Sequence, residues 1–248
     1  MEISNSEMSR CAVIILAGGL GTRLRAVTGG TPKPLVAISG RPFLEYLLDH
    51  LRGMGFEDLF VTASYRRDLI RASVDLYAVR TSSLVRTIDE PTAAGTFGAV
   101  IQAERAIPAQ FDTFLILNGD SLVDGNYGDV FRGLSGRDIS VGGVDVDDCA
   151  RYGRLTADAD GRLRHFAEKS HQGFGTINAG IYALRRSVLN ALPVSLPASM
   201  ELDFMPRAVG ALNVGLVRLG AAPFIDIGTP ESYASAQQFA LFHRLRPA

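Results

Sequence analysis

Hydrophobic positions in this sequence fall into two patterns that alternate along the chain. Residues 11–17 are apolar at every position, as expected of a strand buried on both faces. Further on, apolar residues spaced by three and four predict a helix that begins at Pro42 and ends before Gly55. The alternation of strand and helix continues over residues 58–63, 66–77, 84–89, 95–106 and 113–117. It predicts a doubly wound, Rossmann-like α/β fold built on a parallel sheet.

The pattern changes after about residue 135. Shorter runs of alternating polarity at 139–146, 152–157 and 163–168, two of them joined by a turn at 158–161, predict a small antiparallel addition. A further strand is predicted at 178–184, and helices at 186–192, 203–212 and 230–245. We therefore expect a mixed sheet, a flexible leader at 1–10, and a single domain over 11–248.

Composition narrows the class of protein. The chain has 248 residues, 47% of them hydrophobic, and a formal net charge of −1. A chain this apolar is not disordered, and without a basic excess it is not expected to bind nucleic acid. Its apolar runs are far shorter than the roughly 20 residues of a membrane span, so no membrane association is expected. Its two cysteines, with no signal-peptide pattern, favour a reducing, cytoplasmic location.

The segment 18–34 carries the first candidate chemistry. It follows the first strand, where ligands bind in open α/β sheets, and its glycines allow backbone N–H groups to approach phosphates. Arg23 and Lys33 would add positive charge. The segment does not match the dinucleotide-binding fingerprint G-x-G-x-x-G, because Leu24 stands where the third glycine belongs. It does not match a P-loop either, because the pattern G-x-x-x-x-G-K-[ST] is absent from the sequence. A glycine-rich connector without a ligand is the remaining alternative.

Two aspartates are candidate metal ligands. Asp120 follows the buried run 113–117, and carboxylates at such a position can hold Mg²⁺ beside substrate phosphates. Asp226 follows another apolar run and precedes Gly228, which makes it the natural second carboxylate. Either residue alone fits a turn or a helix cap equally well.

These motifs resemble those of sugar-1-phosphate nucleotidyltransferases (NDP-sugar pyrophosphorylases). The resemblance rests on two motifs, L-A-G-G-x-G-T-R-L at residues 16–24 and P-K-P at residues 32–34. It extends from about Cys11 to Gln238. The family implies the nucleotide-diphospho-sugar transferase fold and the transfer of a nucleotidyl group from an NTP to a sugar 1-phosphate. Segments RPFLEYLL (41–48), RYG (151–153), INAGIY (177–182) and FIDIGTPESY (224–233) resemble D-glycero-D-manno-heptose 1-phosphate guanylyltransferases.

The resemblance assigns roles residue by residue. Arg23 and Lys33 are expected to act on phosphates during catalysis. Expected nucleotide contacts are Leu16, Ala17, Gly18, Gly19, Gly21, Thr22, Glu90, Gly95, Thr96 and Asn118. Expected sugar-phosphate contacts are Gly153, Glu168, Lys169 and Asn178, and the expected Mg²⁺ ligands are Asp120 and Asp226. As surface or turn residues, Glu168, Lys169, Asn178 and Gly153 would need no ligand.

Glu90 falls where the family reads the base. Guanine presents two adjacent donors, N1–H and the 2-amino group, and one carboxylate accepts from both. GTP is therefore the favoured nucleotide, although cytosine also offers an amino donor and a solvated loop glutamate needs no base at all. Phe97 departs from the family, in which a second glycine often follows Gly-Thr.

Lysine is scarce, with 23 Arg and only Lys33 and Lys169 among the basic residues. Both stand at expected phosphate contacts, where a compact ammonium and a planar guanidinium are not equivalent. The alternatives left open are a uridylyl- or cytidylyltransferase for another sugar phosphate, a non-catalytic nucleotide-sugar-sensing subunit, and a dinucleotide-binding redox protein. Assembly into a homo-oligomer also remains open.

Overall fold

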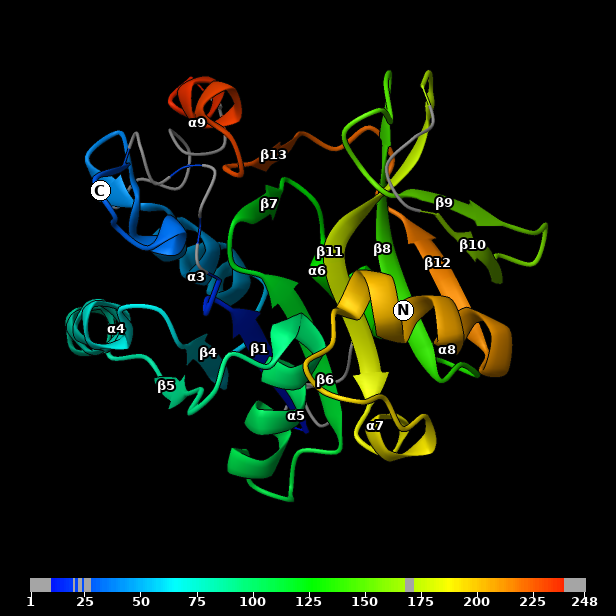
Figure 1. Ribbon diagram of the computed structural model, residues 1–248, viewed down its shortest axis with the longest axis horizontal. Coiled ribbons are helices and arrows are strands. Elements are labelled where there is room, and N and C mark those ends of the chain that lie inside the picture. The colour runs from blue at the N-terminus through cyan, green and yellow to red at the C-terminus, as the bar shows by residue number, and fades with distance from the viewer. Residues whose placement is uncertain (1–9, 20, 22–23, 25–27, 168–171, 239–248) are drawn as a thin grey trace.

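The fold is built on a mixed, nine-stranded sheet, seen in a computed structural model that describes residues 10–19, 21, 24, 28–167 and 172–238 (Figure 1). Seven of its strands follow in the order β10-β9-β11-β6-β1-β4-β5, and β8, with β12 beyond it, also pairs with β11. They are β1 (Cys11–Leu16), β4 (Leu59–Ala63), β5 (Val85–Asp89), β6 (Thr113–Asn118), β8 (Ile139–Val146), β9 (Arg154–Ala157), β10 (Leu163–Phe166), β11 (Gly175–Arg185) and β12 (Val214–Arg218).

Two short ribbons and a set of helices complete the described structure. The ribbons pair β2 (Ala37–Ile38) with β3 (Arg41–Pro42), and β7 (Ser121–Val123) with β13 (Phe224–Asp226). The α-helices are α3 (Phe43–Gly53), α4 (Arg67–Thr81), α5 (Gly95–Ala106), α6 (Tyr127–Arg132), α7 (Val188–Ala191), α8 (Met205–Ala211) and α9 (Pro230–Ala236). A 3₁₀ turn, η1 (Lys33–Leu35), and a π-helical turn, η2 (Met200–Phe204), both lie beside the candidate site described below.

The strand order contains a topological switch point. Strands β1, β4, β5 and β6 are parallel, and the chain passes from β1 outward to β4 and β5 before it returns to β6 on the other side of β1. In open α/β sheets, ligands bind beyond the carboxyl ends of the strands at such a point. Strand β11 then pairs with β6 in the antiparallel direction. The predicted fold class, a doubly wound mixed sheet with an antiparallel addition, is confirmed.

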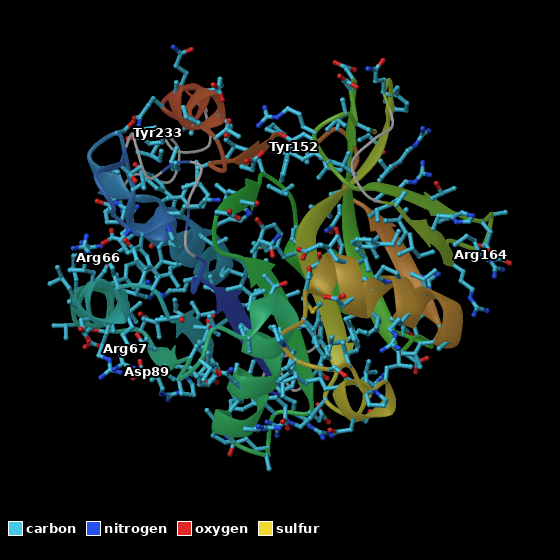
Figure 2. The ribbon with its side chains drawn as sticks, in the orientation of Figure 1. Arg66, Arg67, Asp89, Tyr152, Arg164 and Tyr233 are labelled. Carbon is cyan, nitrogen blue, oxygen red and sulfur yellow. The ribbon has the colours of Figure 1, made fainter. Side chains whose placement is uncertain are left out.

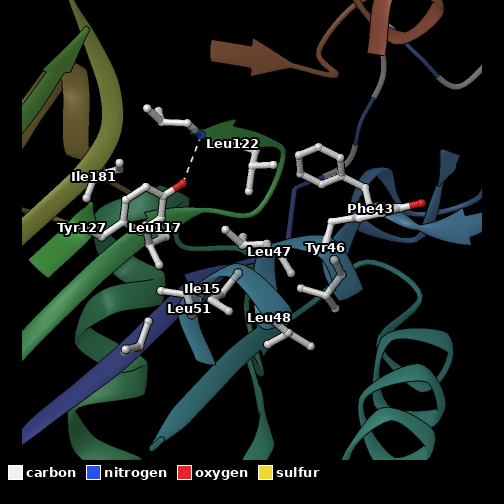
Figure 3. Packing of buried hydrophobic residues seen from close by; sticks show 14 of the residues in the cluster. Ile15, Phe43, Tyr46, Leu47, Leu48, Leu51, Leu117, Leu122, Tyr127 and Ile181 are labelled. Carbon is white, nitrogen blue, oxygen red and sulfur yellow. Dashed lines mark hydrogen bonds between the residues drawn. The ribbon is translucent and has the colours of Figure 1, made fainter. Parts of the chain in front are cut away.

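Both faces of the sheet are covered by helices. Alternate residues of β1 enter two different hydrophobic clusters: Val13 and Ile15 pack with α3, and Ala12 and Ile14 pack with α5 and α8. Figure 3 shows the first cluster, where Tyr127 closes one end and its hydroxyl accepts a hydrogen bond from the backbone N–H of Val123 at 3.0 Å. Apolar residues on both faces of β1 are therefore the physical cause of the three-layer arrangement.

Several predicted bounds are wrong, and most errors lie in the second half of the chain. The helix predicted at 186–192 is a single turn, α7, because Leu192 is extended ahead of Pro193. The helix predicted at 203–212 is preceded by the π-helical turn, which begins at Met200. The helix predicted at 230–245 is described only as α9, since residues beyond 238 lie outside the described structure. The sequence pattern does not predict β7, β12 and β13, which have three to five residues each, although it does predict strands of similar length such as β4 and β9.

Charged side chains are distributed around the molecule. Arg66 and Arg67 at the start of α4 and Arg164 on β10 lie at opposite ends of the view in Figure 2. Arg164 contacts Asp158, the first residue of the predicted turn between β9 and β10. None of the helices that the structure describes is long and apolar enough to cross a membrane.

Candidate functional site

A cavity of about 360 Å³ opens at the switch point, beyond the carboxyl ends of β1 and β6. Gly119 brings the two strand ends together: its N–H bonds the carbonyl oxygen of Leu16 at 3.0 Å, and a Cβ there would lie 2.6 Å from that oxygen. Nine of the predicted nucleotide contacts line this cavity: Leu16, Ala17, Gly18, Gly19, Gly21, Glu90, Gly95, Thr96 and Asn118.

Glu90 forms the wall of this cavity beside Gly18. The two are so close that a Cβ on Gly18 would overlap the Glu90 carboxylate. Glu90 is only 7% exposed, and its Oε1 has no hydrogen-bond partner among the described residues. Burial raises the pKa of this carboxyl above its ordinary value, and a hydrogen bond from Thr62 opposes the shift in part. A buried acceptor without a partner costs stability, which is typical of a group held for a ligand.

The N-terminus of α5 forms the opposite wall. Gly95 has a φ of +77° and packs so closely on Ala198 that a Cβ would overlap the carbonyl oxygen of that residue. Ala198 in turn accepts a hydrogen bond from the N–H of Phe97 at 2.9 Å. The Phe97 ring is buried and stacks on Phe204, with ring centroids 4.3 Å apart. Phe97 does not line the cavity, so its departure from the family pattern leaves the cavity wall unchanged.

Lys33 stands between this cavity and a second one. Its Nζ lies 3.0 Å from Oδ2 of Asp120. Pro32 caps the short turn η1 and Pro34 lies within it, so the backbone around Lys33 is restricted. The side chain also packs on Gly21, whose φ of +59° favours glycine. An ammonium and a carboxylate held together in this way can bind phosphate oxygens and a cation, respectively.

The second cavity, of about 610 Å³, lies on the antiparallel side of the sheet. Gly153, Asn178 and Asp226 line it, as do Phe166 and Ala167. Asn178 sits at a β-bulge, since the pairing of β11 with β8 shifts register between Asn178 and Ile181. The bulge directs side chains toward the cavity, a common use of bulges beside functional sites. The structure thus brings together those predicted sugar-phosphate contacts that it describes.

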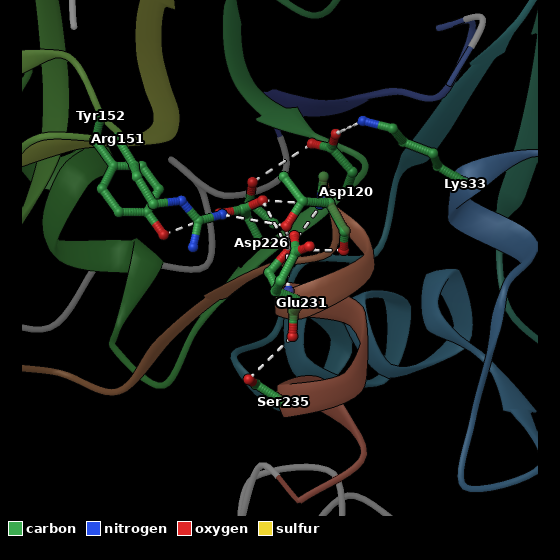
Figure 4. A network of polar contacts seen from close by, with 11 residues as sticks. Lys33, Asp120, Arg151, Tyr152, Asp226, Glu231 and Ser235 are labelled. Carbon is green, nitrogen blue, oxygen red and sulfur yellow. Dashed lines mark hydrogen bonds and ion pairs between the residues drawn. The ribbon is translucent and has the colours of Figure 1, made fainter. Parts of the chain in front are cut away.

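Asp226 is held from both sides. Its Oδ2 accepts a hydrogen bond from the hydroxyl of Tyr152 at 2.9 Å, and its Oδ1 accepts one from the N–H of Gly228 at 2.8 Å. Arg151 approaches within 3.9 Å of Oδ2. Burial, followed by the nearby Asp226 carboxylate, raises the pKa of Tyr152 to about 12, so its hydroxyl stays a neutral donor near pH 7. In Figure 4, Arg151 and Tyr152 approach Asp226 from one side and Lys33 approaches Asp120 from the other.

The two predicted metal ligands are neighbours. The N–H of Ile227 bonds the carbonyl oxygen of Asp120 at 2.9 Å, and both carboxylates line the second cavity. No group of three or more His, Cys, Asp or Glu side chains with metal-binding geometry occurs in the part of the chain that the structure describes. Mg²⁺ commonly takes one or two carboxylates and completes its shell with phosphate oxygens and water. Two aspartates on neighbouring segments that both line the second cavity fit that pattern.

Four predicted site residues lie outside the described residues: Thr22, Arg23, Glu168 and Lys169. Their expected roles stay predictions.

Sequence reasoning missed Glu201, which lines both cavities. It belongs to the π-helical turn, whose N-cap Ser199 accepts hydrogen bonds from the N–H groups of Glu201 and Leu202. A serine followed by acidic residues is a helix-start signal that the sequence does contain. That signal marks only the start of a helix, and the position of Glu201 at the site follows from contacts with distant residues.

Comparison with known proteins identifies the family. The family model described as Nucleotidyl transferase matches residues 12–242. The chain belongs to the nucleotidyl transferase family. A structure of HddC from Yersinia pseudotuberculosis is similar to this nucleotidyl transferase, with a TM-score of 0.80 and 38% identity, over 92% of this chain and 98% of that one. A second structure of HddC, described as complexed with GMP-PN, gives the same values.

Two curated relatives extend the comparison. The chain is 31% identical to the D-glycero-alpha-D-manno-heptose 1-phosphate guanylyltransferase of Aneurinibacillus thermoaerophilus, over 91% of this chain and 96% of the relative. It is 30% identical to the catalytic subunit beta of mannose-1-phosphate guanylyltransferase from Drosophila pseudoobscura pseudoobscura, over 89% of this chain. It spans only 60% of the length of that Drosophila protein.

Proposed function

We propose that this nucleotidyl transferase is a sugar-1-phosphate guanylyltransferase, which transfers the guanylyl group of GTP to a sugar 1-phosphate and releases pyrophosphate. The observation that carries the proposal is the wall shared by the two cavities. Lys33, Asn118, Asp120 and Glu201 line both. A nucleotide in the first cavity and a phosphorylated sugar in the second would therefore meet beside Lys33 and Asp120. The names of the relatives support the same class of reaction.

The reaction needs no protein base. The second pKa of a phosphate monoester lies near 6, so the sugar phosphate is already a nucleophile at neutral pH. One of its oxygens forms a bond to the α-phosphorus of GTP, while the bond from that phosphorus to the bridging oxygen breaks and pyrophosphate leaves with the electron pair. Catalysis then consists of positioning and charge neutralisation. Lys33 would bind phosphate oxygens, and Asn118 would contact the nucleotide from the wall of the first cavity.

Asp120 and Asp226 would hold Mg²⁺ during turnover. When bound, Mg²⁺ would supply positive charge to the triphosphate and the departing pyrophosphate. The hydrogen bonds from Tyr152 and Gly228 orient the Asp226 carboxylate and leave lone pairs available on both oxygens. Lys33 holds the Asp120 carboxylate in a similar way.

Glu90 supports guanine as the base. Its buried Oε1 lacks a partner and lies in the wall of the first cavity. Guanine's N1–H and 2-amino group would supply the donors that this carboxylate lacks, whereas uracil and thymine would place a carbonyl oxygen against it. A bidentate contact of this kind is worth about 1–3 kcal/mol of discrimination between bases.

We further propose D-glycero-D-manno-heptose 1-phosphate as the sugar substrate. The heptose relative from Aneurinibacillus is matched over 96% of its length, compared with 60% for the Drosophila mannose relative. The two sugars share the manno ring and differ in the carbon chain beyond it, so mannose 1-phosphate is the matched alternative. A role in supplying nucleotide sugars from the cytoplasm stays a prediction.

A matrix of substrates tests the proposal. The four NTPs are each combined with the 1-phosphates of heptose, mannose and glucose, with Mg²⁺ or with EDTA, and pyrophosphate release is measured. We expect turnover with GTP and the heptose, no turnover in EDTA, and a GTP preference that falls at least tenfold in Glu90→Gln. Asp89→Asn is the matched control, because the adjacent Asp89 carboxylate pairs with Arg71 outside both cavities.

Two results would contradict the proposal in different ways. Product with UTP or CTP but none with GTP would show that the base is read differently. Tight binding of GTP and the sugar phosphate without any pyrophosphate release would instead identify a nucleotide-sugar-sensing subunit.

A further inference from the structure

Glu201 belongs to the wall shared by the two cavities, called the seam from here on, and each of its carboxylate oxygens faces two hydrogen-bond donors. Oε1 faces the side-chain amide of Asn118 at 3.4 Å and the hydroxyl of Tyr182 at 3.3 Å. Oε2 faces the hydroxyls of Thr96 at 3.4 Å and Ser199 at 3.1 Å. These four donors come from α5, β6, β11 and the residue before the π-helical turn. One side chain therefore ties together four segments that are distant in the sequence.

On the side of the second cavity, the Tyr182 hydroxyl connects Glu201 to Asn178. The Tyr182 hydroxyl, which donates to Glu201, accepts a hydrogen bond from Nδ2 of Asn178 at 2.6 Å. Oδ1 of Asn178 accepts from the N–H of Gly180 at 3.0 Å. Together these bonds fix which end of the Asn178 amide faces the second cavity. Tyr182 is fully buried, so its hydroxyl has no water to replace Glu201.

On the nucleotide side, Glu201 orients Thr96 and Asn118. The Thr96 hydroxyl also accepts from the N–H of Met200 at 2.8 Å, so it donates to Glu201 with its single proton. The Asn118 amide nitrogen points to Glu201, which leaves the amide oxygen for a ligand. Gly180 permits this packing, because a Cβ there would lie 2.6 Å from that nitrogen.

The lengths of these contacts suggest how the two sides communicate. Three of the four Glu201 contacts measure 3.3–3.4 Å, beyond the usual 2.5–3.0 Å of an O–H···O bond and 2.7–3.2 Å of an N–H···O bond. A ligand that orders Thr96 and Asn118 would shorten these bonds and fix the carboxylate. The second ligand would then find Tyr182 and Asn178 already ordered and would lose less conformational entropy on binding.

We propose that Glu201 is a positioning residue that couples the two substrate pockets, so that each substrate binds more tightly when the other is present. The inference rests on the proposed function, since it needs a nucleotide in one cavity and a sugar phosphate in the other. The side chain at position 201 must accept hydrogen bonds from four donors. A carboxylate meets this requirement, whereas a glutamine in its place accepts at only one of its two terminal atoms.

Binding measurements without turnover test this coupling. The dissociation constant of mannose 1-phosphate or the heptose 1-phosphate is measured by calorimetry, with and without guanosine α,β-methylene triphosphate, which cannot be cleaved at the reacting bond. We expect the analogue to tighten sugar-phosphate binding at least fivefold in the natural chain, and less than twofold in Glu201→Gln. Asp203→Asn is the matched control in the same turn, because Asp203 accepts from the N–H of Ser199 outside both cavities.

A second variant separates positioning from a general loss of structure. Tyr182→Phe removes the hydroxyl that joins Glu201 to Asn178, so we expect the GTP analogue to tighten sugar-phosphate binding less than twofold in this variant, as in Glu201→Gln. Thermal unfolding confirms that each variant is folded.

Three results would count against the coupling. Coupling in Glu201→Gln or in Tyr182→Phe equal to that of the natural chain would overturn it, as would binding of both ligands to the natural chain without any mutual tightening. Failure of the natural chain to bind the GTP analogue at all would overturn the proposed function, and the coupling with it.

Discussion

The two cavities are built in different ways, although they share a wall. The first cavity, called the nucleotide cavity because we propose that it binds GTP, is formed largely by backbone at the ends of parallel strands, where glycines such as Gly18 and Gly95 allow close approach. The second cavity, called the sugar cavity because we propose that it binds the sugar phosphate, is lined by side chains from β11, from β13 and from the loop before β9, among them Asn178, Asp226 and Tyr152. The first depends on the absence of side chains at particular positions, and the second on contacts between side chains far apart in the sequence.

This difference determines how each cavity should respond to substitution. A backbone cradle tolerates little change, because a single Cβ at Gly95 overlaps the backbone carbonyl of Ala198. A network of side-chain hydrogen bonds loses its members one at a time, and each loss costs about 0.5–1.5 kcal/mol. The largest effect is expected at the seam, whose residues line both cavities.

Lys33 lines both cavities together with Asn118, Asp120 and Glu201, and because it is the cation of these four described residues, its replacement should have the largest effect. Lys33→Ala removes the ammonium that lies 3.0 Å from Asp120 and faces both cavities. We expect kcat to fall by about 10²–10³, the usual cost of losing one preorganised donor, with the fold intact by circular dichroism. Lys33→Arg keeps the charge but replaces a compact ammonium with a larger planar group, and we expect a smaller loss.

Arg164→Ala serves as the control for Lys33, because Arg164 lies on β10 and pairs with Asp158 away from both cavities. A folded Lys33→Ala protein with near-normal turnover would show that the seam does not bind phosphate. It would also remove the main reason for placing the two substrates side by side.

The sequence predicts the nucleotide cavity well because its determinants are local. A buried strand followed by a glycine-rich loop already implies a ligand site at the end of a parallel sheet, and the structure has Leu16, Gly18 and Gly19 there. The Lys33-Pro34 segment belongs to the same stretch of chain. A few consecutive residues therefore carry most of the information.

The sugar cavity could be predicted only in part. Asp226 and Asn178 are recognisable by family resemblance, but the hydroxyl of Tyr152 reaches Asp226 across 74 positions of sequence. Glu201 meets Thr96 across 105 positions, and no periodicity links them. Such contacts follow from the order of strands in the sheet, which short, weakly patterned strands such as β12 and β13 do not reveal.

Tyr152→Phe tests whether the sugar cavity depends on such a long-range contact. The variant keeps the ring against Phe224 and removes only the hydrogen bond to Asp226. Because Asp226 is a proposed Mg²⁺ ligand, we expect kcat at saturating substrates to fall two- to tenfold, which corresponds to about 0.5–1.5 kcal/mol. Because the pKa of Tyr152 is raised to about 12, the effect should be constant between pH 6.5 and 9.

Tyr233→Phe provides the comparison for Tyr152, since the Tyr233 hydroxyl donates to the carbonyl of Ala37 outside both cavities. An unchanged kcat in Tyr152→Phe would mean that Asp226 acts without the long-range contact to Tyr152. The distinction between the cavities would then be weaker than their construction implies.

The smallest expected effect is on stability, and it concerns Glu90, whose buried Oε1 has no hydrogen-bond partner among the described residues. Burial raises the pKa of Glu90 in the folded state, so the folded chain holds the proton more tightly than the unfolded chain does. This contribution to stability is fully present below the unfolded pKa of about 4.3, and it is lost as the pH rises through the folded value. Glu90→Gln removes the buried charge, so the variant does not lose this stability as the pH rises.

We therefore expect the melting temperature of ligand-free Glu90→Gln to match that of the natural chain near pH 4.3 and to exceed it by about 2–4 °C at pH 8, for a gain of about 1 kcal/mol. Saturating GTP should reverse the order, because guanine supplies the missing donors only to the carboxylate. If the difference between the two melting temperatures instead stays constant across this pH range, the buried Glu90 carboxylate does not destabilise the ligand-free protein. The nucleotide cavity would then read its base through the backbone alone, which would make its contrast with the sugar cavity complete.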